Sequence, residues 1–191
     1  EPEMINPEKR AALKLLCTIG PLCYLSDYKS MALTAMEMVN LALDYGQAPE
    51  LGYAYATYGM VIVTYGGGNY PQAYQLGQAA LAISERFRDL SMKCQASLIF
   101  NASIHHWIKP IKEGNAINAE GFRAGQDSGE LQYTGYLCLY KSLHGYYQGQ
   151  PLENLLDDIP QYMYYCRKTG NRWAVDALLG LRLILNNLQG K

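Results

Sequence analysis

The sequence repeats at a spacing of 41 residues, and this repeat limits the possible folds more than any other feature. Three sets of residues recur at that spacing. They are Cys17, Tyr58, Ile99, Tyr140 and Leu181; Gly20, Val61, Ala102, Leu143 and Ile184; and Tyr24, Tyr65, His106, Tyr147 and Leu188. Within one unit the three positions lie three and four residues apart, which places them on one face of a helix. We therefore expect each unit to bury this face.

Turn-forming residues divide each unit into two helices. The breaks fall at Gly46 to Pro49, Gly66 to Asn69, Pro110, Gly129 and Gly149 to Pro151. We expect first helices over about 7–25, 50–65, 90–108, 130–147 and 171–188, and second helices over about 28–45, 70–87, 112–127 and 153–168. Asp27 is placed to cap the first of the second helices. Pro160 should kink or restart the last of them.

The predicted fold class is all-α, because no segment alternates convincingly with period two and β-branched residues are sparse. A stack of helical hairpins with a repeat of about 41 residues predicts a right-handed α-solenoid of about nine helices, forming one domain over 1–191. Its repeats are expected at about 7–46, 50–87, 90–128 and 130–169, with a half repeat at 171–189.

The unit is longer than the 34-residue tetratricopeptide repeat. One second helix nevertheless has a similar spacing of small and aromatic residues: Tyr70, Ala73, Tyr74, Gly77, Ala80 and Leu81. Small side chains at two of these positions, Gly77 and Ala80, would let a neighbouring backbone approach closely. The hairpins are therefore expected to be tetratricopeptide-like.

Composition excludes several classes of partner. Sixteen basic and seventeen acidic residues give a net charge of −1, and without a basic stripe neither nucleic acid nor anionic lipid is expected to bind. Uninterrupted apolar runs are far shorter than the roughly 20 residues of a membrane span. Five cysteines without a C-x-x-C pair indicate free thiols in a reducing compartment, and no targeting segment is recognisable. The predicted location is the cytoplasm.

No motif predicts a catalytic, metal or cofactor site. Gly66 to Gly68 precede Tyr70 and Pro71 rather than the Lys and Ser/Thr of a phosphate-binding loop, so they are interpreted as a turn. Asp157 and Asp158 have no partner base or nucleophile nearby in the sequence. His105 and His106 point about 100° apart on a helix and are badly placed to share a metal. His106 belongs to the column expected in the core, whereas the column of His105 is mostly polar and could face a groove.

The tyrosines support two interpretations. Tyr133, Tyr136, Tyr140 and Tyr147 follow helical spacing and form one stripe. Packing inside and between repeats is the favoured role for most tyrosines, while the alternative is that some line a concave groove as binding anchors. Five residues on the first helices are candidates for contacting a ligand in such a groove: Tyr53, Asn101, His105, Lys141 and Tyr146.

Several blocks of the sequence resemble a known protein family. They are YAYATYG (53–59), YQLGQAALAISERF (74–87), IHHW (104–107), GQDSGELQYTGY (125–136) and YYQGQPLENL (146–155). These blocks are similar to the helical-repeat segment of very large bacterial multi-sensor signalling proteins. In that family the segment follows a serine/threonine kinase domain and a P-loop signalling ATPase, and precedes a GAF sensor and often a histidine kinase.

The resemblance implies a non-catalytic regulatory scaffold, cut from a longer chain, that contacts other proteins or neighbouring domains of the same chain. No kinase loop, Walker motif or phosphoacceptor histidine box occurs in the sequence. The alternative is an effector-binding sensor module that holds a peptide or small molecule in its concave groove. A hydrolase or transferase that uses His105 is a third hypothesis.

Overall fold

The computed structural model describes residues 2–65 and 67–191, and within these ranges the chain is all-helical, as the sequence predicts. Nine α-helices and two short 3₁₀ helices follow one another in the described part. They are α1 (Pro7–Ser26), α2 (Tyr28–Tyr45), α3 (Leu51–Tyr65), α4 (Tyr70–Arg86), α5 (Leu90–Ser103), η1 (His105–Trp107), η2 (Ile111–Gly114), α6 (Asn115–Ser128), α7 (Leu131–Tyr147), α8 (Leu152–Lys168) and α9 (Arg172–Leu188).

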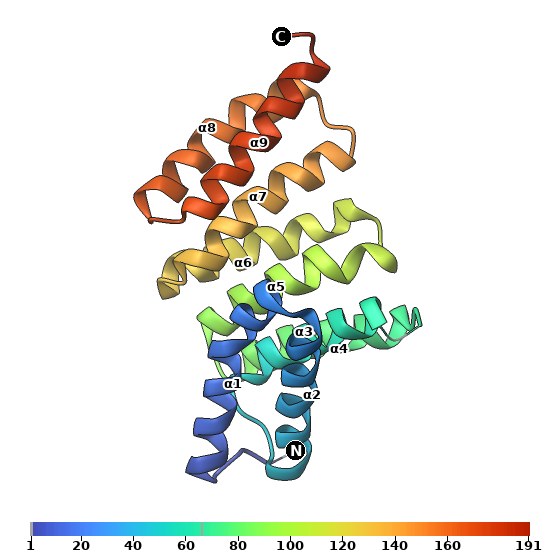
Figure 1. Ribbon diagram of the computed structural model, residues 1–191, viewed down its shortest axis with the longest axis vertical. Helices are drawn as coiled ribbons and strands as arrows, with labels where there is room; N and C mark the ends of the chain where they lie inside the picture. The colour runs from blue at the N-terminus through green and yellow to red at the C-terminus, as the bar shows by residue number, and fades with distance from the viewer. Residues whose placement is uncertain (1, 66) are drawn as a thin grey trace.

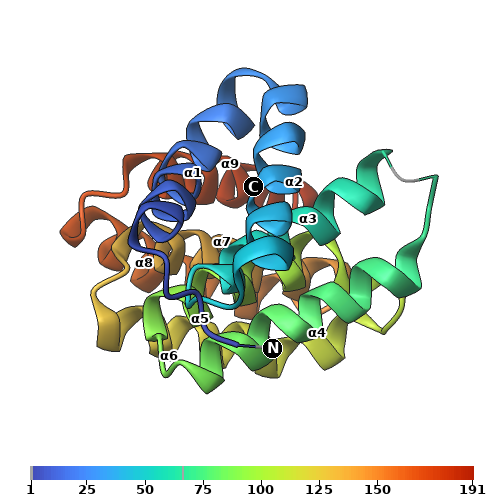
Figure 2. The same ribbon diagram turned by 90° about the horizontal axis from the view of Figure 1, so that it is seen from below.

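Each α-helix packs against the next one along the chain, and from α3 onward successive helices run in roughly opposite directions (Figure 1). The odd-numbered helices from α3 to α9 form a layer of their own, in which α3 contacts α5, α5 contacts α7 and α7 contacts α9. The pair α1 and α2 is attached through α2, which packs on α3, and it runs at a steep angle to the remaining helices (Figures 1 and 2). The result is an elongated, curved stack with the two termini at opposite ends (Figure 1).

Local sequence explains where the helices begin and end. The side chain of Asp27 accepts hydrogen bonds from the amides of Lys29 and Ser30, each at 3.1 Å, which confirms it as the cap of α2. The hydroxyl of Ser30 also donates a hydrogen bond to this carboxylate. This bond lowers the pKa of the Asp27 carboxyl most, and the amide bonds add to the effect. Gly129 follows α6 in the left-handed conformation that favours glycine. Gly67 and Gly68 also have positive φ, while Gly66 lies outside the described residues.

Two predicted helix boundaries are wrong. Helix α5 ends at Ser103 rather than near 108, and α6 begins at Asn115 rather than near 112. The intervening chain forms η1 and η2 around Pro110, which cannot donate a backbone hydrogen bond and disfavours helical geometry in the residue before it. Pro160 was expected to kink or restart α8, and because α8 continues through it as one helix, the proline does not restart it.

The predicted buried face is only partly correct. In the column that begins with Cys17, Ile99 and Leu181 are buried and the others are half-buried. The column that begins with Tyr24 is exposed at all five positions. Three of its members are the last residues of α3, α7 and α9, so they extend beyond the stretch that neighbouring helices cover. Leu181 is buried, but Ile184 and Leu188 of α9 are more than half exposed, so part of the apolar face of α9 is bare.

The core consists of two main clusters of buried side chains. One joins α1, α2, α3 and parts of α4 and α5, and the other joins α7, α8 and α9. Gly77 was expected to admit a neighbouring backbone, but the group packed against it is the ring of Phe100 on α5. A β-carbon at Gly77 would lie 2.1 Å from Cδ2 of that ring.

Candidate functional site

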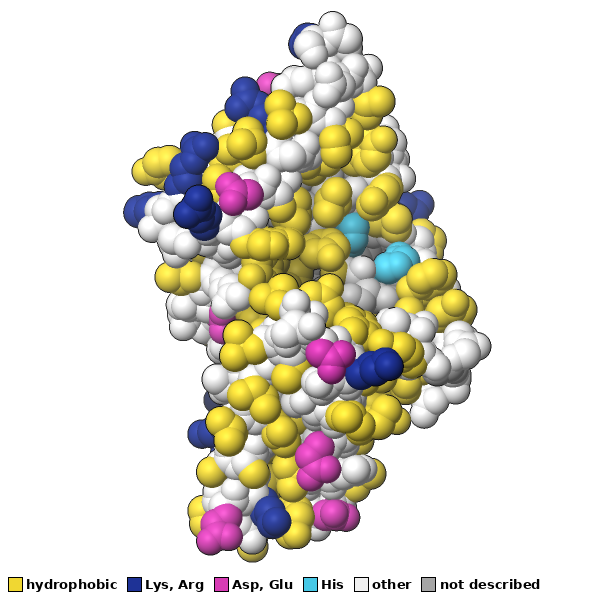
Figure 3. Space-filling view, in the orientation of Figure 1, with side chains coloured by type: hydrophobic (Ala, Val, Ile, Leu, Met, Phe, Trp, Pro, Cys, Tyr) yellow, Lys and Arg dark blue, Asp and Glu magenta, His cyan; other side chains and the backbone are white. Residues whose placement is uncertain are grey.

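A cavity of about 270 Å³ opens on the layer of odd-numbered helices. We call it the central groove. Figure 3 shows hydrophobic side chains gathered around a hollow midway along this face of the molecule. Its lining side chains come from α1, α2, α3, α5, α7 and α9 and carry no formal charge. They are Pro21, Tyr24, Leu25, Met31, Tyr53, Thr57, Met60, Leu98, Ile99, Ala102, Ser103, Gln132, Tyr133, Tyr136, Tyr140 and Trp173.

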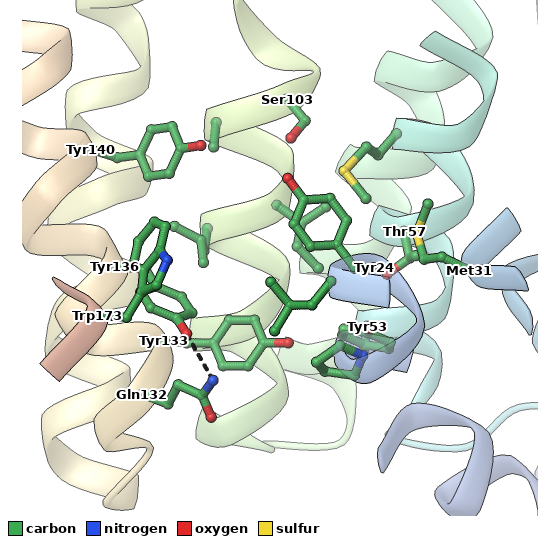
Figure 4. Close-up of a pocket in the computed structure, with 16 residues that line it drawn as sticks. Tyr24, Met31, Tyr53, Thr57, Ser103, Gln132, Tyr133, Tyr136, Tyr140 and Trp173 are labelled. Atoms are coloured by element: carbon green, nitrogen blue, oxygen red, sulfur yellow. Dashed lines mark hydrogen bonds between the residues drawn. The ribbon is translucent and has the colours of Figure 1, made fainter. Parts of the chain in front are cut away.

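One wall of the central groove is a series of aromatic rings. The ring centroids of Tyr133 and Tyr136 lie 5.9 Å apart, and those of Tyr136 and Trp173 lie 4.9 Å apart, both in edge-to-face geometry. Gln132 Nε2 donates a 2.8 Å hydrogen bond to the hydroxyl of Tyr136 (Figure 4). These contacts hold the rings of α7 and α9 against one another, so the wall is formed before any ligand arrives.

The deepest part of the groove is lined by Tyr53 and Thr57 of α3. Tyr53 is only 3% exposed, and its hydroxyl lies so close to Gly20 of α1 that a β-carbon there would be 2.5 Å away. Burial raises the pKa of Tyr53 to about 12, and burial also raises the pKa of Tyr133 well above its usual value. Both phenols therefore remain neutral at physiological pH. The Thr57 hydroxyl is buried and interacts with the Tyr53 phenol, which opposes the effect of burial on the tyrosine pKa, but it makes no well-formed hydrogen bond.

Tyr24 and Tyr140 lie at opposite sides of the groove, with Ser103 between them in the close-up view (Figure 4). Tyr24 is about half exposed, whereas Tyr140 is half-buried. Burial raises the pKa of Tyr140, and proximity to Tyr24 and Tyr147 adds to the effect. Tyr140 therefore offers a neutral hydroxyl group on its side of the groove.

The structure disperses the five residues that the sequence analysis proposed for binding. Only Tyr53 lines the central groove. Asn101 is buried against η2, where a β-carbon at Gly114 would lie 2.0 Å from its Oδ1, and neither polar atom of its side chain has a hydrogen-bond partner. His105 is buried as well, and Tyr146 packs against the neighbouring Tyr147 with ring centroids 5.7 Å apart.

The fifth of these residues, Lys141, lies at a different cavity. Its ammonium group stands 5.2 Å from the centroid of the Tyr162 ring, and its hydrogen bond to Tyr162 raises the lysine pKa. This second cavity measures about 460 Å³, opens between α6, α7 and α8, and also includes Arg123 and Asp158. Lys141 therefore does not share a site with Tyr53.

The roles expected for two histidines are reversed. His106 was placed in the core and His105 beside a groove, but His106 is exposed and His105 is buried. The expectation assumed a helix through both residues, whereas the chain leaves α5 at Ile104 and continues as η1. Within the described ranges, no three His, Cys, Asp or Glu side chains are grouped so that they could hold a metal ion.

Sequence reasoning missed most of the groove residues. Tyr133, Tyr136 and Tyr140 were recognised as a stripe, but packing was the favoured role. Tyr24 was assigned to a buried face, and Trp173 and Thr57 carried no signal of their own. Their convergence depends on contacts between helices that are distant in sequence, which one chain's periodicity does not encode.

Comparison with known proteins finds a distant similarity to a signal-transduction protein. No protein-family profile matches it. It is 24% identical over 163 residues to hybrid signal transduction histidine kinase G of Dictyostelium discoideum. The match covers 85% of this chain and 5% of that protein, so the chain spans a small fraction of its relative. Among the described residues no helix combines the length and apolar character that crossing a membrane requires. The chain is thus an all-helical segment with a distant similarity to a signalling histidine kinase.

Proposed function

We propose that the chain is a non-catalytic scaffold in a signal-transduction protein, built as a right-handed α-solenoid of tetratricopeptide-like hairpins. It holds neighbouring domains of the same longer chain against its two ends. The observation that carries the proposal is the pair of exposed apolar surfaces at those ends.

The surface at the N-terminal end is formed by α1 and α2. Leu15 and Leu22 of α1 and Leu33 and Leu43 of α2 are each 63–69% exposed. Leu15 and Leu22 are seven residues apart, which keeps them on one face of α1. Large exposed apolar surfaces are unusual in isolated domains and are typical of interaction sites.

The surface at the other end belongs to α9, which has no following helix among the described residues. Leu183, Ile184 and Leu188 are each more than half exposed there. Repeat stacks need a covering element at each end for solubility. The distant similarity to a small portion of a large signalling kinase supports neighbouring domains in that role.

Hydrogen exchange in the full-length gene product tests this proposal. Amides of α1, α2 and α9 should exchange more slowly there than in the isolated 191-residue chain, because neighbouring domains cover both ends. Leu33→Glu in the full-length product should restore fast exchange in α1 and α2. Leu131→Glu is the matched control, because Leu131 is exposed at the start of α7, away from both ends.

Two results would contradict the scaffold. One is a native gene product whose intact mass equals that of this chain. The other is identical exchange of the three helices in the full-length product and in the isolated chain. Binding of an effector is a second candidate function, and the uncharged central groove is the observation that favours it.

A further inference from the structure

We propose that the central groove binds an uncharged small molecule that contains one or two aromatic rings and a hydrogen-bonding group. This inference concerns a different surface from the scaffold proposal and does not depend on it. The argument rests on the charge, the shape, the polar groups and the size of the groove.

Charge selects a neutral ligand. None of the sixteen lining side chains is an acid or base that carries a formal charge, and burial keeps the phenols of Tyr53 and Tyr133 protonated. A carboxylate that entered the groove would lose hydration without gaining a counter-charge, which is strongly unfavourable. An ammonium group would gain cation–π attraction from the tyrosine and tryptophan rings, but this attraction recovers only a small part of the hydration that an unpaired ion loses on burial. The groove therefore discriminates against ions of either sign.

The walls favour flat rings. Tyr133, Tyr136 and Trp173 present a preformed aromatic surface on one side, and Tyr24 faces it from α1 (Figure 4). Aromatic pairs gain energy beyond the burial of their area when they stack offset or edge to face. A ring between these walls makes such contacts without any rearrangement of the helices.

A buried polar group is available deep in the groove. The Thr57 hydroxyl is 1% exposed, and although it interacts with the Tyr53 phenol it makes no well-formed hydrogen bond, which is costly for a buried polar group. A hydroxyl or amide on the ligand would satisfy it. Placing one convergent polar group among apolar walls is typical of small-molecule sites.

Size favours a small molecule over a polypeptide. The volume of about 270 Å³ is close to the lower limit of ligand pockets, roughly 300 Å³.

A series of isosteric probes tests the inference on the isolated chain. Biphenylmethanol is neutral, biphenylcarboxylate is an anion and biphenylmethylammonium is a cation. Trp107→Phe leaves Trp173 as the single tryptophan, so its fluorescence reports on the groove, and calorimetry on the unmodified chain provides an independent reading. Biphenylmethanol should bind at least tenfold more tightly than either ion.

Variants then locate the binding. Thr57→Val should weaken the binding of biphenylmethanol about 3- to 10-fold, the effect of one lost hydrogen bond. Ala102→Phe, which fills the groove, should weaken it more than tenfold. Ala79→Phe on the exposed surface of α4 should leave it unchanged. Circular dichroism checks the fold of each variant, and Thr57→Val with the charge series remains decisive if Ala102→Phe does not fold.

Three outcomes would overturn the inference. The first is binding of an ion as tight as that of the alcohol. The second is binding that Ala102→Phe and Thr57→Val both leave intact. The third is no binding of any of the three probes at millimolar concentration. If an uncharged leucine-rich peptide binds in their place, the groove is a site for a polypeptide. None of these results affects the exchange experiment on the two ends.

Discussion

Replacing Gly77 with alanine should destabilise the chain through a single contact. A β-carbon at this position would lie 2.1 Å from Cδ2 and 2.5 Å from Cε2 of Phe100. Carbon atoms pack comfortably at roughly 3.5–4.0 Å, so the ring would have to move by more than about 1 Å. Phe100 is 1% exposed and is confined by the rings of Tyr74 and His105, at centroid distances of 5.2 and 5.7 Å. Overpacking of this kind costs about 1–3 kcal/mol.

Gly180 provides the matched control. It lies within α9, and no atom stands within 4 Å of a β-carbon built there. Gly180→Ala should therefore gain the helix propensity of alanine, about 1 kcal/mol, with no steric cost. The same gain applies to Gly77→Ala, so the difference in unfolding free energy between the two variants isolates the overpacking. We expect that difference to be about 1–3 kcal/mol, with Gly77→Ala the less stable variant.

Urea unfolding followed by far-ultraviolet circular dichroism measures this difference. The double variant Gly77→Ala with Phe100→Leu should lose less stability than the sum of the two single variants, because the smaller side chain makes room for the methyl group. Equal stabilities of Gly77→Ala and Gly180→Ala would refute the packing of α4 on α5 described above.

Three further predictions concern buried polar groups. Burial is the main reason that the pKa of His144 is lowered to about 4, so the unfolded chain binds a proton at this residue more readily than the folded chain does. The free energy of unfolding should therefore fall by about 2 kcal/mol from pH 7 to pH 5. In urea titrations, His144→Gln should lose most of that pH dependence. Asn171 caps α9 and donates a 2.8 Å hydrogen bond to the Gln132 carbonyl. In urea titrations, Asn171→Ala should lower the free energy of unfolding by about 1–3 kcal/mol. The loss should exceed that of Asn69→Ala, which removes the exposed cap of α4. Burial raises the pKa of the fully buried Cys94 to about 12, so this thiol should resist alkylation in the folded chain and react on unfolding. Rapid labelling of Cys94 under native conditions would contradict its burial.

Helix positions were predictable because they depend on short-range signals. The cap at Asp27 and the glycine at 129 mark helix ends through local backbone chemistry, and both were recognised in the sequence. The boundary at Ser103 was missed because a helical pattern continues through His106 in the 41-residue column. That continuation also reversed the positions inferred for the two adjacent histidines.

The groove was harder to predict than the helices. A periodic stripe identifies a helix face, but it does not distinguish a face covered by a neighbour from one that surrounds a cavity. Tyr136 and Tyr24 illustrate the difficulty, since both follow helical spacing and both line the groove. Neither spacing encodes the steep angle at which α1 and α2 join the stack, which Figure 1 shows.

The arrangement of the groove also has a mechanical consequence. Tyr24 of α1 and Trp173 of α9 belong to the walls of one cavity, although they come from opposite ends of the sequence. A pulling force that straightens the curved stack would separate these walls, and a molecule bridging them would resist the extension. The stiffness of the chain between its two ends is thereby coupled to the occupancy of a site near its middle.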